Sequence, residues 1–335
     1  MKNKFKKIYN FNYKFLMRNI ILLESNPDYS DNTKGVFDEL LLRGINDNNR
    51  IIWFVNDKNK FSSINLKNVR FISRNKNIFN RICRLYYMIF SKYIIDCNKY
   101  IYKINKNQFR IHLTHGTPIK NAKDYCSKVG DIDYLIQVSD FFTEMHSNIF
   151  NVDKSKIVST GFPRNDILLS DKTHKFYPNI EREKTILWFP TYRNHKSGKN
   201  SIYKMNINFP YGIPCISDNN DLLNLNEYLK KKNILLLIKL HPAEDSSKIS
   251  SVDLSNIKLL DDSIFDVDHS CLYNYLGNSD AVITDYSSLY YDYLLTNKPI
   301  GLAIPDIEEY KKHVNLVFDD YEKNIAGEYI YNYND

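Results

Sequence analysis

The chain has 335 residues, of which 43% are hydrophobic and 25% are charged, as in soluble globular proteins. This length is too great for one ordinary hydrophobic core, so we expect two domains. The net charge of +7 is moderate and fits an anionic substrate or membrane surface, but it does not require a nucleic acid.

The cysteines argue against a disulfide framework or a zinc site. Five of them are scattered along the chain, and no Cys-x-x-Cys pair occurs. This pattern favours a reducing compartment. The basic N-terminus is interrupted by Lys14 and Arg18, so we expect no signal peptide. No uninterrupted apolar run approaches the length that spans a membrane.

The first half of the chain alternates predicted strands and helices. Apolar β-prone runs predict strands at residues 19–23, 50–55, 69–73, 92–96, 109–113, 134–138 and 156–159. Helical spacing predicts helices at residues 32–42, 77–91 and 139–150. This alternation is typical of a parallel sheet in an α/β domain.

The predicted helix at residues 77–91 is amphipathic. Its apolar face carries Ile78, Ile82, Leu85, Tyr86 and Ile89, and its other face carries Arg81, Arg84 and Lys92. We expect the apolar face to dock on the protein. The alternative is a basic amphipathic helix that lies on anionic lipid, and the basic N-terminus adds weight to it.

A histidine follows the predicted strand at residues 109–113, within His115-Gly-Thr-Pro-Ile-Lys120. Thr117 is a good N-cap and Pro118 a good first helical residue, so we expect a helix to begin there, with Lys120 one turn along it. Gly116 allows close approach of the backbone. His115 would then lie at the tip of a strand–helix turn, whereas His112 within the strand is expected to be structural.

The second half predicts strands at residues 185–189, 233–240, 257–260, 281–283 and 300–304. Helices are expected at residues 220–232, at 271–276 and from 289 to a stop before Asn297. Residues 194–220 form a long irregular loop, which we expect to be mobile.

Three polar turns follow three of these strands. They are Pro190-Thr191-Tyr192-Arg193, Lys239-Leu-His241-Pro242 and Thr284-Asp285-Tyr286-Ser287-Ser288. A parallel sheet places all three turns at one edge, where α/β proteins bind ligands. A cation, an imidazole, hydroxyls and a helix N-terminus together suit a pyrophosphate.

Five motifs occur in one order: His115-Gly-Thr-Pro-Ile-Lys120, Gly161-Phe-Pro-Arg164-Asn-Asp166, Pro190-Thr-Tyr-Arg193, Lys239-Leu-His-Pro242 and Ile283-Thr-Asp-Tyr-Ser-Ser288. With these motifs the chain resembles the CDP-glycerol glycerophosphotransferases, the teichoic acid primase and polymerase family. The resemblance extends from about Glu24 almost to the C-terminus. It departs from the family at Thr114, where an aromatic residue is usual, and in the absence of a Pro-Gly segment and further helices after Asp335.

The resemblance implies an α/β fold of GT-B architecture, with two Rossmann-like domains facing a cleft. Residues 1–169 would form the acceptor-side domain with His115, residues 170–184 a linker, and residues 185–335 the CDP-binding domain, without the final crossover helices. His115 would be the general base, and His241, Ser287 and Ser288 would bind the pyrophosphate. Arg164 and Arg193 would be supporting cations. We also expect Gly116, Thr117, Lys120, Pro190, Thr191, Tyr192, Thr284 and Asp285 to contribute to substrate binding.

The implied reaction moves glycerol phosphate from CDP-glycerol to a hydroxyl of a lipid-linked or polymer acceptor and releases CMP, in teichoic acid or capsule synthesis. It would take place at the cytoplasmic face of the membrane, by peripheral association. No metal or other cofactor is expected, because GT-B enzymes use helix dipoles and basic residues. Asp131-Ile-Asp133 and Asp266-Val-Asp268 are interpreted as solvated turns.

Several alternatives remain at the level of sequence. A CDP-ribitol donor would fit the same motifs. A GT-B glycosyltransferase using a nucleotide sugar would share the fold but would usually carry a Glu-rich ribose-binding motif, which is not found. A non-catalytic, membrane-peripheral carbohydrate-binding protein would not need His115 or His241. Nucleic acid is not expected as a partner, since the positive charge is spread and no known motif occurs.

Overall fold

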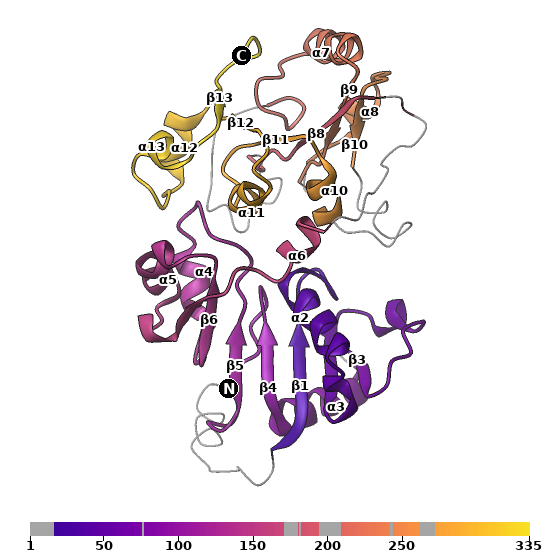
Figure 1. The fold of residues 1–335 in the computed structure, drawn as a ribbon, viewed down its shortest axis with the longest axis vertical. Helices are drawn as coiled ribbons and strands as arrows, with labels where there is room; N and C mark the ends of the chain where they lie inside the picture. Colours follow the sequence, from indigo (N-terminus) through magenta and orange to yellow (C-terminus); the bar gives the residue numbers. More distant parts are fainter. Residues whose placement is uncertain are drawn as a thin grey trace. The chain divides into compact units, whose positions relative to one another are not determined.

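The computed structural model describes residues 17–75, 77–170, 180, 182–193, 209–241, 244–260 and 272–335. The chain divides into two compact units (Figure 1). The first comprises Met1–Thr117 and Ala122–Asp166, and the second comprises Pro118–Asn121 and Ile167–Asp335. The predicted linker and the predicted mobile loop lie largely outside the described residues.

The first unit contains a parallel sheet in the order β3-β2-β1-β4-β5-β6-β7. Its strands are β1 (Arg18–Glu24), β2 (Arg50–Val55), β3 (Val69–Ser73), β4 (Ser91–Asp96), β5 (Phe109–His112), β6 (Tyr134–Gln137) and β7 (Ile157–Ser159). Its helices are α2 (Asp31–Leu42), α3 (Ile78–Phe90), α4 (Lys123–Cys126) and α5 (Thr143–Phe150), and α6 (Asn165–Leu168) begins at its end. Short 3-10 turns include η5 (Asp140–Phe142). The predicted strands and longer helices are confirmed to within about two residues.

The central strands β1 and β2 are buried on both faces, as expected when helices cover a parallel sheet. Ile21 and Leu23 of β1 pack in a cluster with Phe37 of α2. Leu22, which points to the opposite face, packs in a second cluster with Tyr87 of α3. Helices α2 and α3 therefore cover opposite faces of the same strand.

Helix α3 corrects the expectation that its apolar face is docked. Ile78, Ile82 and Leu85 have 68%, 61% and 47% of their surface exposed, and the helix instead buries Asn80 and Tyr87. An apolar stripe predicts that a helix binds an apolar surface, but it does not say whether that surface belongs to the protein. Here three residues of the predicted stripe face outward, whereas Tyr86 packs against the core and Ile89 is partly buried.

The second unit contains a parallel sheet in the order β10-β9-β8-β11-β12-β13. Its strands are β8 (Lys184–Trp188), β9 (Ile234–Ile238), β10 (Ile257–Leu259), β11 (Ala281–Thr284), β12 (Ile300–Ala303) and β13 (Glu328–Ile330). Its helices are α7 (Asn219–Lys231), α8 (Ser247–Ser250), α10 (Leu272–Asn278), α11 (Leu289–Tyr293), α12 (Ile307–His313) and α13 (Tyr321–Asn324). The turn η7 (Leu294–Thr296) extends α11. Strand β13 and helices α8, α12 and α13 were not predicted, because they are short and lie in polar stretches.

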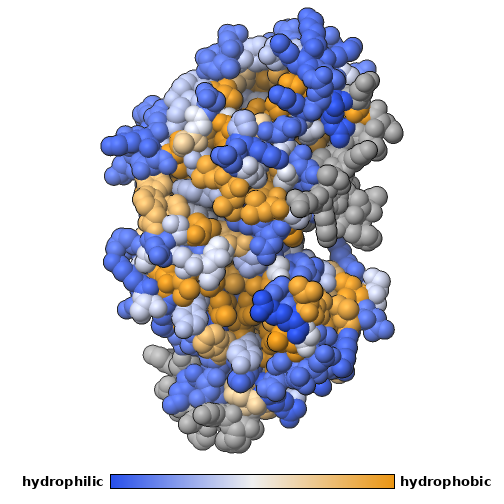
Figure 2. Space-filling view, viewed as in Figure 1, coloured by the Kyte–Doolittle hydropathy of each residue, from blue (hydrophilic) through white to orange (hydrophobic). Residues whose placement is uncertain are grey.

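Both sheets reverse their strand order at one point. The reversal lies between β1 and β4 in the first unit and between β8 and β11 in the second. Ligands of open α/β sheets bind at the carboxyl ends of strands beside such a reversal. The turns after these strands are therefore the places to look for a site. On the face shown in Figure 2, hydrophobic residues lie among hydrophilic ones in both units.

Candidate functional site

His115 lies in a loop that directly follows β5, as predicted, but no helix begins at Pro118. The next helix, α4, begins at Lys123. Thr114 has a left-handed backbone with a φ of 54°, which is unusual for a β-branched residue. The side-chain amide of Asn32 donates to the Thr114 carbonyl at 3.1 Å. A strained backbone held by a buried side chain is a feature of functional sites.

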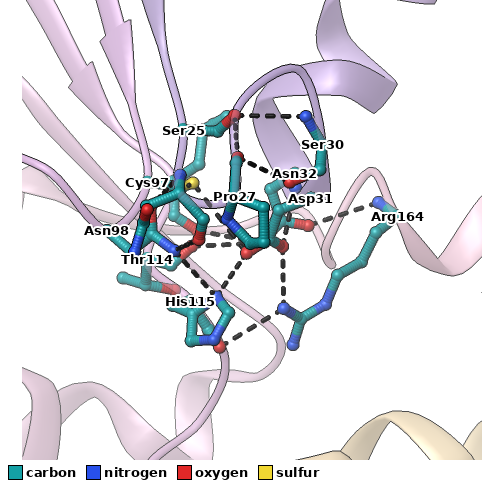
Figure 3. A network of polar contacts seen from close by, with 12 residues as sticks. Ser25, Pro27, Ser30, Asp31, Asn32, Cys97, Asn98, Thr114, His115 and Arg164 are labelled. Atoms are coloured by element: carbon teal, nitrogen blue, oxygen red, sulfur yellow. Dashed lines mark hydrogen bonds and ion pairs between the residues drawn. The ribbon is translucent and has the colours of Figure 1, made fainter. Parts of the chain in front are cut away.

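The His115 imidazole contacts the carboxylate of Asp31 (Figure 3). Its Nδ1 lies in a short hydrogen bond with Asp31 Oδ2, and the amide nitrogen of Asn98 is 3.4 Å from the same ring atom. The carboxylate is almost buried, with 6% of its side chain exposed, whereas 60% of the His115 side chain is exposed. Because an ionised carboxylate can only accept, Nδ1 donates, and Nε2 of the neutral ring carries the lone pair. A histidine in this state can accept a proton.

Arg164 holds the same carboxylate from the other side. Its Nη1 donates to Asp31 Oδ1 at 2.8 Å and to the carbonyl of His115 at 3.3 Å. Burial disfavours the charged form of Asp31, but the Arg164 guanidinium and His115 outweigh it, so the pKa of Asp31 lies well below its usual range. Arg164 was predicted as a substrate-binding cation, and the structure places it as the buried partner of a carboxylate.

Close packing brings Arg164 to Asp31. A Cβ built on Gly35 of α2 would lie 2.8 Å from the Cβ of Pro163 and 2.9 Å from its backbone carbon. Only glycine therefore lets the loop before Arg164 approach α2 this closely. The backbone N–H of Arg164 also donates to the Asn32 side chain at 3.2 Å.

Sequence reasoning missed Asp31, Asn32 and Asn98. Asp31 and Asn32 open the helix after β1, and Asn98 follows β4, so all three lie at the carboxyl ends of the strands where the sheet reverses. The rule that located His115 applies equally to these positions. Asp31 was overlooked because an acidic residue at the start of a helix is usually a cap.

Of the other residues predicted to lie near His115, Gly116 and Thr117 follow it in the loop, whereas Lys120 belongs to the second unit. Gly116 has a φ of 120°, and Thr117 is fully buried. The Thr117 hydroxyl finds no partner among the described residues. Lys120 belongs to the second unit, where it pairs with Leu316 in an antiparallel bridge. The expected placement of Lys120 one helical turn from His115 is wrong, since residues 118–120 form no helix.

In the second unit, the turns after β8 and β11 are joined by buried charges. Asp285 accepts from the backbone N–H of Thr191 at 2.9 Å and forms an ion pair with Arg193. Arg193 also donates to Asp306 at 2.8 Å, and only 3% of it is exposed. Burial opposes its charge, but the two carboxylates prevail and raise the pKa of Arg193. Arg193 was predicted as a substrate cation, but its charge is already balanced within the protein.

Lys120 lies beside this cluster. Burial lowers the pKa of its ammonium group, with Arg193 acting in the same direction and Asp285 opposing. The Asp285 backbone carbonyl accepts from the hydroxyl of Tyr321 at 2.7 Å. These contacts fix the backbone of the turn that carries the two serines.

The predicted pyrophosphate residues differ in how accessible they are. Pro190, Thr284 and Asp285 are buried, and the Thr284 hydroxyl donates to the carbonyl of Phe189 at 3.1 Å. Thr191, Tyr192, Ser287 and Ser288 are half-buried, and His241 is exposed. The rings of Tyr192 and His241 stack, with centroids 4.9 Å apart and planes 18° apart. The structure thus places Tyr192 against His241, while Pro242 lies outside the described residues.

No group of three or more His, Cys, Asp or Glu side chains in the described part of the chain could hold a metal ion. Asp131 and Asp133 were interpreted as solvated, and they pair with Lys103 at 3.5 and 2.6 Å. Asp266 and Asp268 lie outside the described residues. None of the helices in the described ranges combines the length and apolar character needed to cross a membrane.

Known proteins resemble this chain over most of its length. A teichoic acid glycerol-phosphate transferase of Staphylococcus aureus is 26% identical over 227 residues, which cover 65% of this chain and 53% of that protein. A teichoic acid poly(glycerol phosphate) polymerase of Bacillus spizizenii is 25% identical over 342 residues, which cover 92% and 79%. A teichoic acid ribitol-phosphate primase of the same organism is 26% identical over 63% of this chain and 51% of its own length. The chain thus spans about half of the first and third of these relatives.

Solved structures share the fold. A structure of the wall teichoic acid polymerase TagF aligns with 99% of this chain and 82% of its own, with a TM-score of 0.70 and 22% sequence identity. A sequence model of the family described as CDP-Glycerol:Poly(glycerophosphate) glycerophosphotransferase matches residues 8–335. The chain belongs to this glycerophosphotransferase family.

Proposed function

We propose that the protein transfers glycerol phosphate from CDP-glycerol to a hydroxyl of a lipid-linked or polymer acceptor and releases CMP. The observation that carries the proposal is His115, an exposed histidine at a strand tip with its Nδ1 bonded to a buried carboxylate. Membership of the glycerophosphotransferase family supports the substrate class. The names of the relatives include both glycerol-phosphate and ribitol-phosphate enzymes, so CDP-ribitol is the second candidate donor.

In the proposed reaction, the acceptor oxygen attacks the phosphorus that bears the glycerol. A new oxygen–phosphorus bond forms, the bond from this phosphorus to the bridging oxygen breaks, and CMP leaves with that oxygen. The acceptor proton goes to Nε2 of His115. An alcohol is a poor nucleophile at neutral pH, and a positioned base contributes typically about 10²–10⁴-fold to such a step.

The second unit is proposed to bind the CDP part of the donor. Ser287, Ser288 and His241 are accessible and stand at the carboxyl edge of its sheet. Their hydroxyl and imidazole groups would donate to the diphosphate and to the charge that builds on CMP. Asp285 and Arg193 would act indirectly, by holding the turns after β8 and β11 together. In this proposal the first unit of a GT-B enzyme supplies the base and the second unit supplies the donor-binding turns.

We further propose that the protein works at an anionic membrane surface. The exposed apolar residues of α3 lie on the same helix as Arg81, which is also exposed. Apolar and basic side chains on one exposed helix suit a lipid surface with negative headgroups. Residues 1–16, part of the basic segment predicted to assist, lie outside the described residues.

The donor is tested first by binding. Thermal unfolding is followed with CDP-glycerol, CDP-ribitol and a UDP-sugar at equal concentrations. A donor present at about 100 times its Kd adds about 2.7 kcal/mol of stability, which raises Tm by several degrees. We expect a CDP-alditol to raise Tm and the UDP-sugar to leave it unchanged. Stabilisation by the UDP-sugar alone would contradict the proposal.

The roles of the two histidines are tested by comparing His115→Gln with His241→Ala. His115→Gln should slow single-turnover CMP release by about 10²–10⁴-fold while donor Kd stays the same. His241→Ala should weaken donor binding as well as slow the reaction. Circular dichroism checks that both variants fold. A His115→Gln enzyme of near-normal rate would disprove the role of His115 as base. If only His115→Gln lost donor affinity, His115 would be the donor-binding histidine and His241 the base.

A further inference from the structure

We propose that Asp31 is a positioning residue that holds His115 in the tautomer with its proton on Nδ1, so that Nε2 is free to take the acceptor proton. The inference rests on the proposed function of His115 as the base. Asp31 does not need to touch substrate, because it acts through the imidazole.

The first support is the geometry around the carboxylate. Asp31 Oδ2 lies on His115 Nδ1, and Asp31 Oδ1 accepts from Arg164 at 2.8 Å and from the Asn32 backbone at 2.7 Å (Figure 3). Both oxygens are therefore occupied by donors, and a carboxylate held by donors remains ionised. An ionised carboxylate can only be paired with an N–H, which fixes the tautomer of the ring.

The second support is the backbone. Asp31 has a φ of 61°, in the left-handed region that L-residues other than Asn and Asp seldom adopt. A helix that needed only a cap would not require this conformation. From this position the Asp31 side chain bonds His115 in the loop after β5, and Thr114, the residue before His115, also has a positive φ of 54°. One partner of the hydrogen bond and the neighbour of the other thus have uncommon backbones, which indicates that the fold imposes this contact.

Arg164 completes the arrangement. It balances the charge of Asp31 and also donates to the His115 carbonyl at 3.3 Å, so the carboxylate and the histidine loop share one cation. With Arg164 in place, the His115 backbone and the carboxylate that pairs with its ring contact the same guanidinium. The amide nitrogen of Asn98 is 3.4 Å from Nδ1, farther than the Asp31 carboxylate, so Asp31 is the nearer partner of this ring atom.

The test uses Asp31→Asn, which removes the charge but keeps the shape and tolerates a left-handed backbone. Histidine-selective ¹⁵N NMR reports the tautomer of His115 at mildly alkaline pH, where imidazoles are neutral. The resonances are assigned by their loss in His115→Gln. We expect the Nδ1–H form in the unaltered protein and a shift toward the Nε2–H form in Asp31→Asn, because the new amide can donate to Nδ1.

Activity gives the second reading. Asp31→Asn should lower kcat by at least about tenfold, because a ring with its proton on Nε2 cannot accept the acceptor proton there. The loss should not exceed the loss in His115→Gln. In the double variant, Asp31→Asn should add no further loss of activity to that of His115→Gln, because both substitutions disable the same catalytic group. Asp38→Asn is the matched control. It removes a carboxylate from the same helix that forms a surface ion pair with Lys34, and it should change neither the tautomer nor the activity.

The outcomes separate the two proposals. A changed tautomer with a fully active His115→Gln enzyme supports the positioning role and disproves His115 as the base. An unchanged tautomer in Asp31→Asn disproves the positioning role, even if activity or stability falls. Asp31→Gly, which also tolerates a positive φ, replaces Asp31→Asn if that variant does not fold.

Discussion

At the scale of single residues, buried charge decides which of the predicted site residues remain available to a substrate. Arg164 and Arg193 were both predicted as supporting cations that contribute to substrate binding. Each is instead almost fully buried and paired with carboxylates. Burying a guanidinium is costly unless acceptors surround it, so partners of this kind are the usual accompaniment of a buried arginine. In the second unit, Thr191, Tyr192, Ser287, Ser288 and His241 are accessible enough to contact a ligand.

Replacing Arg193 tests this interpretation. Arg193→Met would leave Asp285 and Asp306 buried without their cation, and breaking a buried pair in this way costs about 3–5 kcal/mol. Urea unfolding is followed by the fluorescence of Trp188, which lies in the second unit, in a Trp53→Phe background. Lys311→Met, which breaks a surface pair with Glu308, should cost no more than about 1 kcal/mol. Equal losses in the two variants would show that the Arg193 cluster is not a stabilising network.

At the scale of elements, α3 shows that an amphipathic pattern does not say whether the apolar face packs on the protein or faces outward. Its hydrophobic face is as regular as that of a docked helix, yet Ile78, Ile82 and Leu85 are exposed. The side that does pack contains Tyr87 with Cys83, Tyr86 and Phe90, which also recur at helical spacing. The helix thus carries two apolar stripes, and its sequence alone does not say which of them packs against the sheet.

Exchanging exposed apolar residues for acids tests the proposed lipid contact. Ile82→Glu together with Leu85→Glu should weaken binding to phosphatidylglycerol vesicles by tenfold or more, because apolar contact is lost and charge repulsion is gained. Since both side chains are exposed, stability should change by no more than about 0.5 kcal/mol. Leu295→Glu, at an exposed leucine of the second unit, is the control. Vesicle binding that survives the double substitution would exclude α3 as the contact.

At the scale of the whole molecule, each unit has its own hydrophobic core, and the two can be followed separately. Trp53 lies in a core cluster of the first unit and Trp188 in one of the second. The chain contains two tryptophans in total. Removing either one gives a protein whose fluorescence reports a single unit. This makes a dependence of stability on pH assignable to one part of the chain.

His146 should make the first unit less stable in acid. It is fully buried, its Nδ1 donates to the amide oxygen of Gln137 at 2.9 Å, and its Nε2 has no partner within the described residues. Burial lowers the pKa of His146 to about 4. The unfolded chain binds this proton near pH 6.5, so the stability that the neutral ring contributes is present above that pH. It is lost as pH falls toward 4, by about 3 kcal/mol in total.

The measurement compares urea unfolding at pH 7.5 and pH 4.5 in a Trp188→Phe background, with and without His146→Phe. The phenylalanine fits beside Phe142 and Phe150, which contact the native ring. The difference between the two pH values is compared within each protein, so an overall cost of the substitution cancels. The variant should lose most of the acid dependence of the unaltered protein. An identical dependence in both proteins would rule out His146 as its source.

Local sequence patterns predicted all of the described strands except β13, the longer helices and the turns at the carboxyl ends of the strands. These follow from local patterns, since an apolar run of four to eight residues bounded by polar turns is typical of a buried strand. The same patterns placed His115 at a strand tip and the Ser287–Ser288 turn after β11. The resemblance of five ordered motifs also identified the family correctly.

The tertiary structure alone decided how these residues are paired. Asp31 and His115 are 84 positions apart, and Arg193 is 92 positions from Asp285, so no local pattern could join them. Lys120 was misplaced because Thr-Pro favours a helix locally, whereas the bridge to Leu316 holds the segment extended in the second unit. Long-range contacts override such weak local preferences, because each preference is worth about 1 kcal/mol or less. They also determine which charges are balanced and which remain free to act on a ligand.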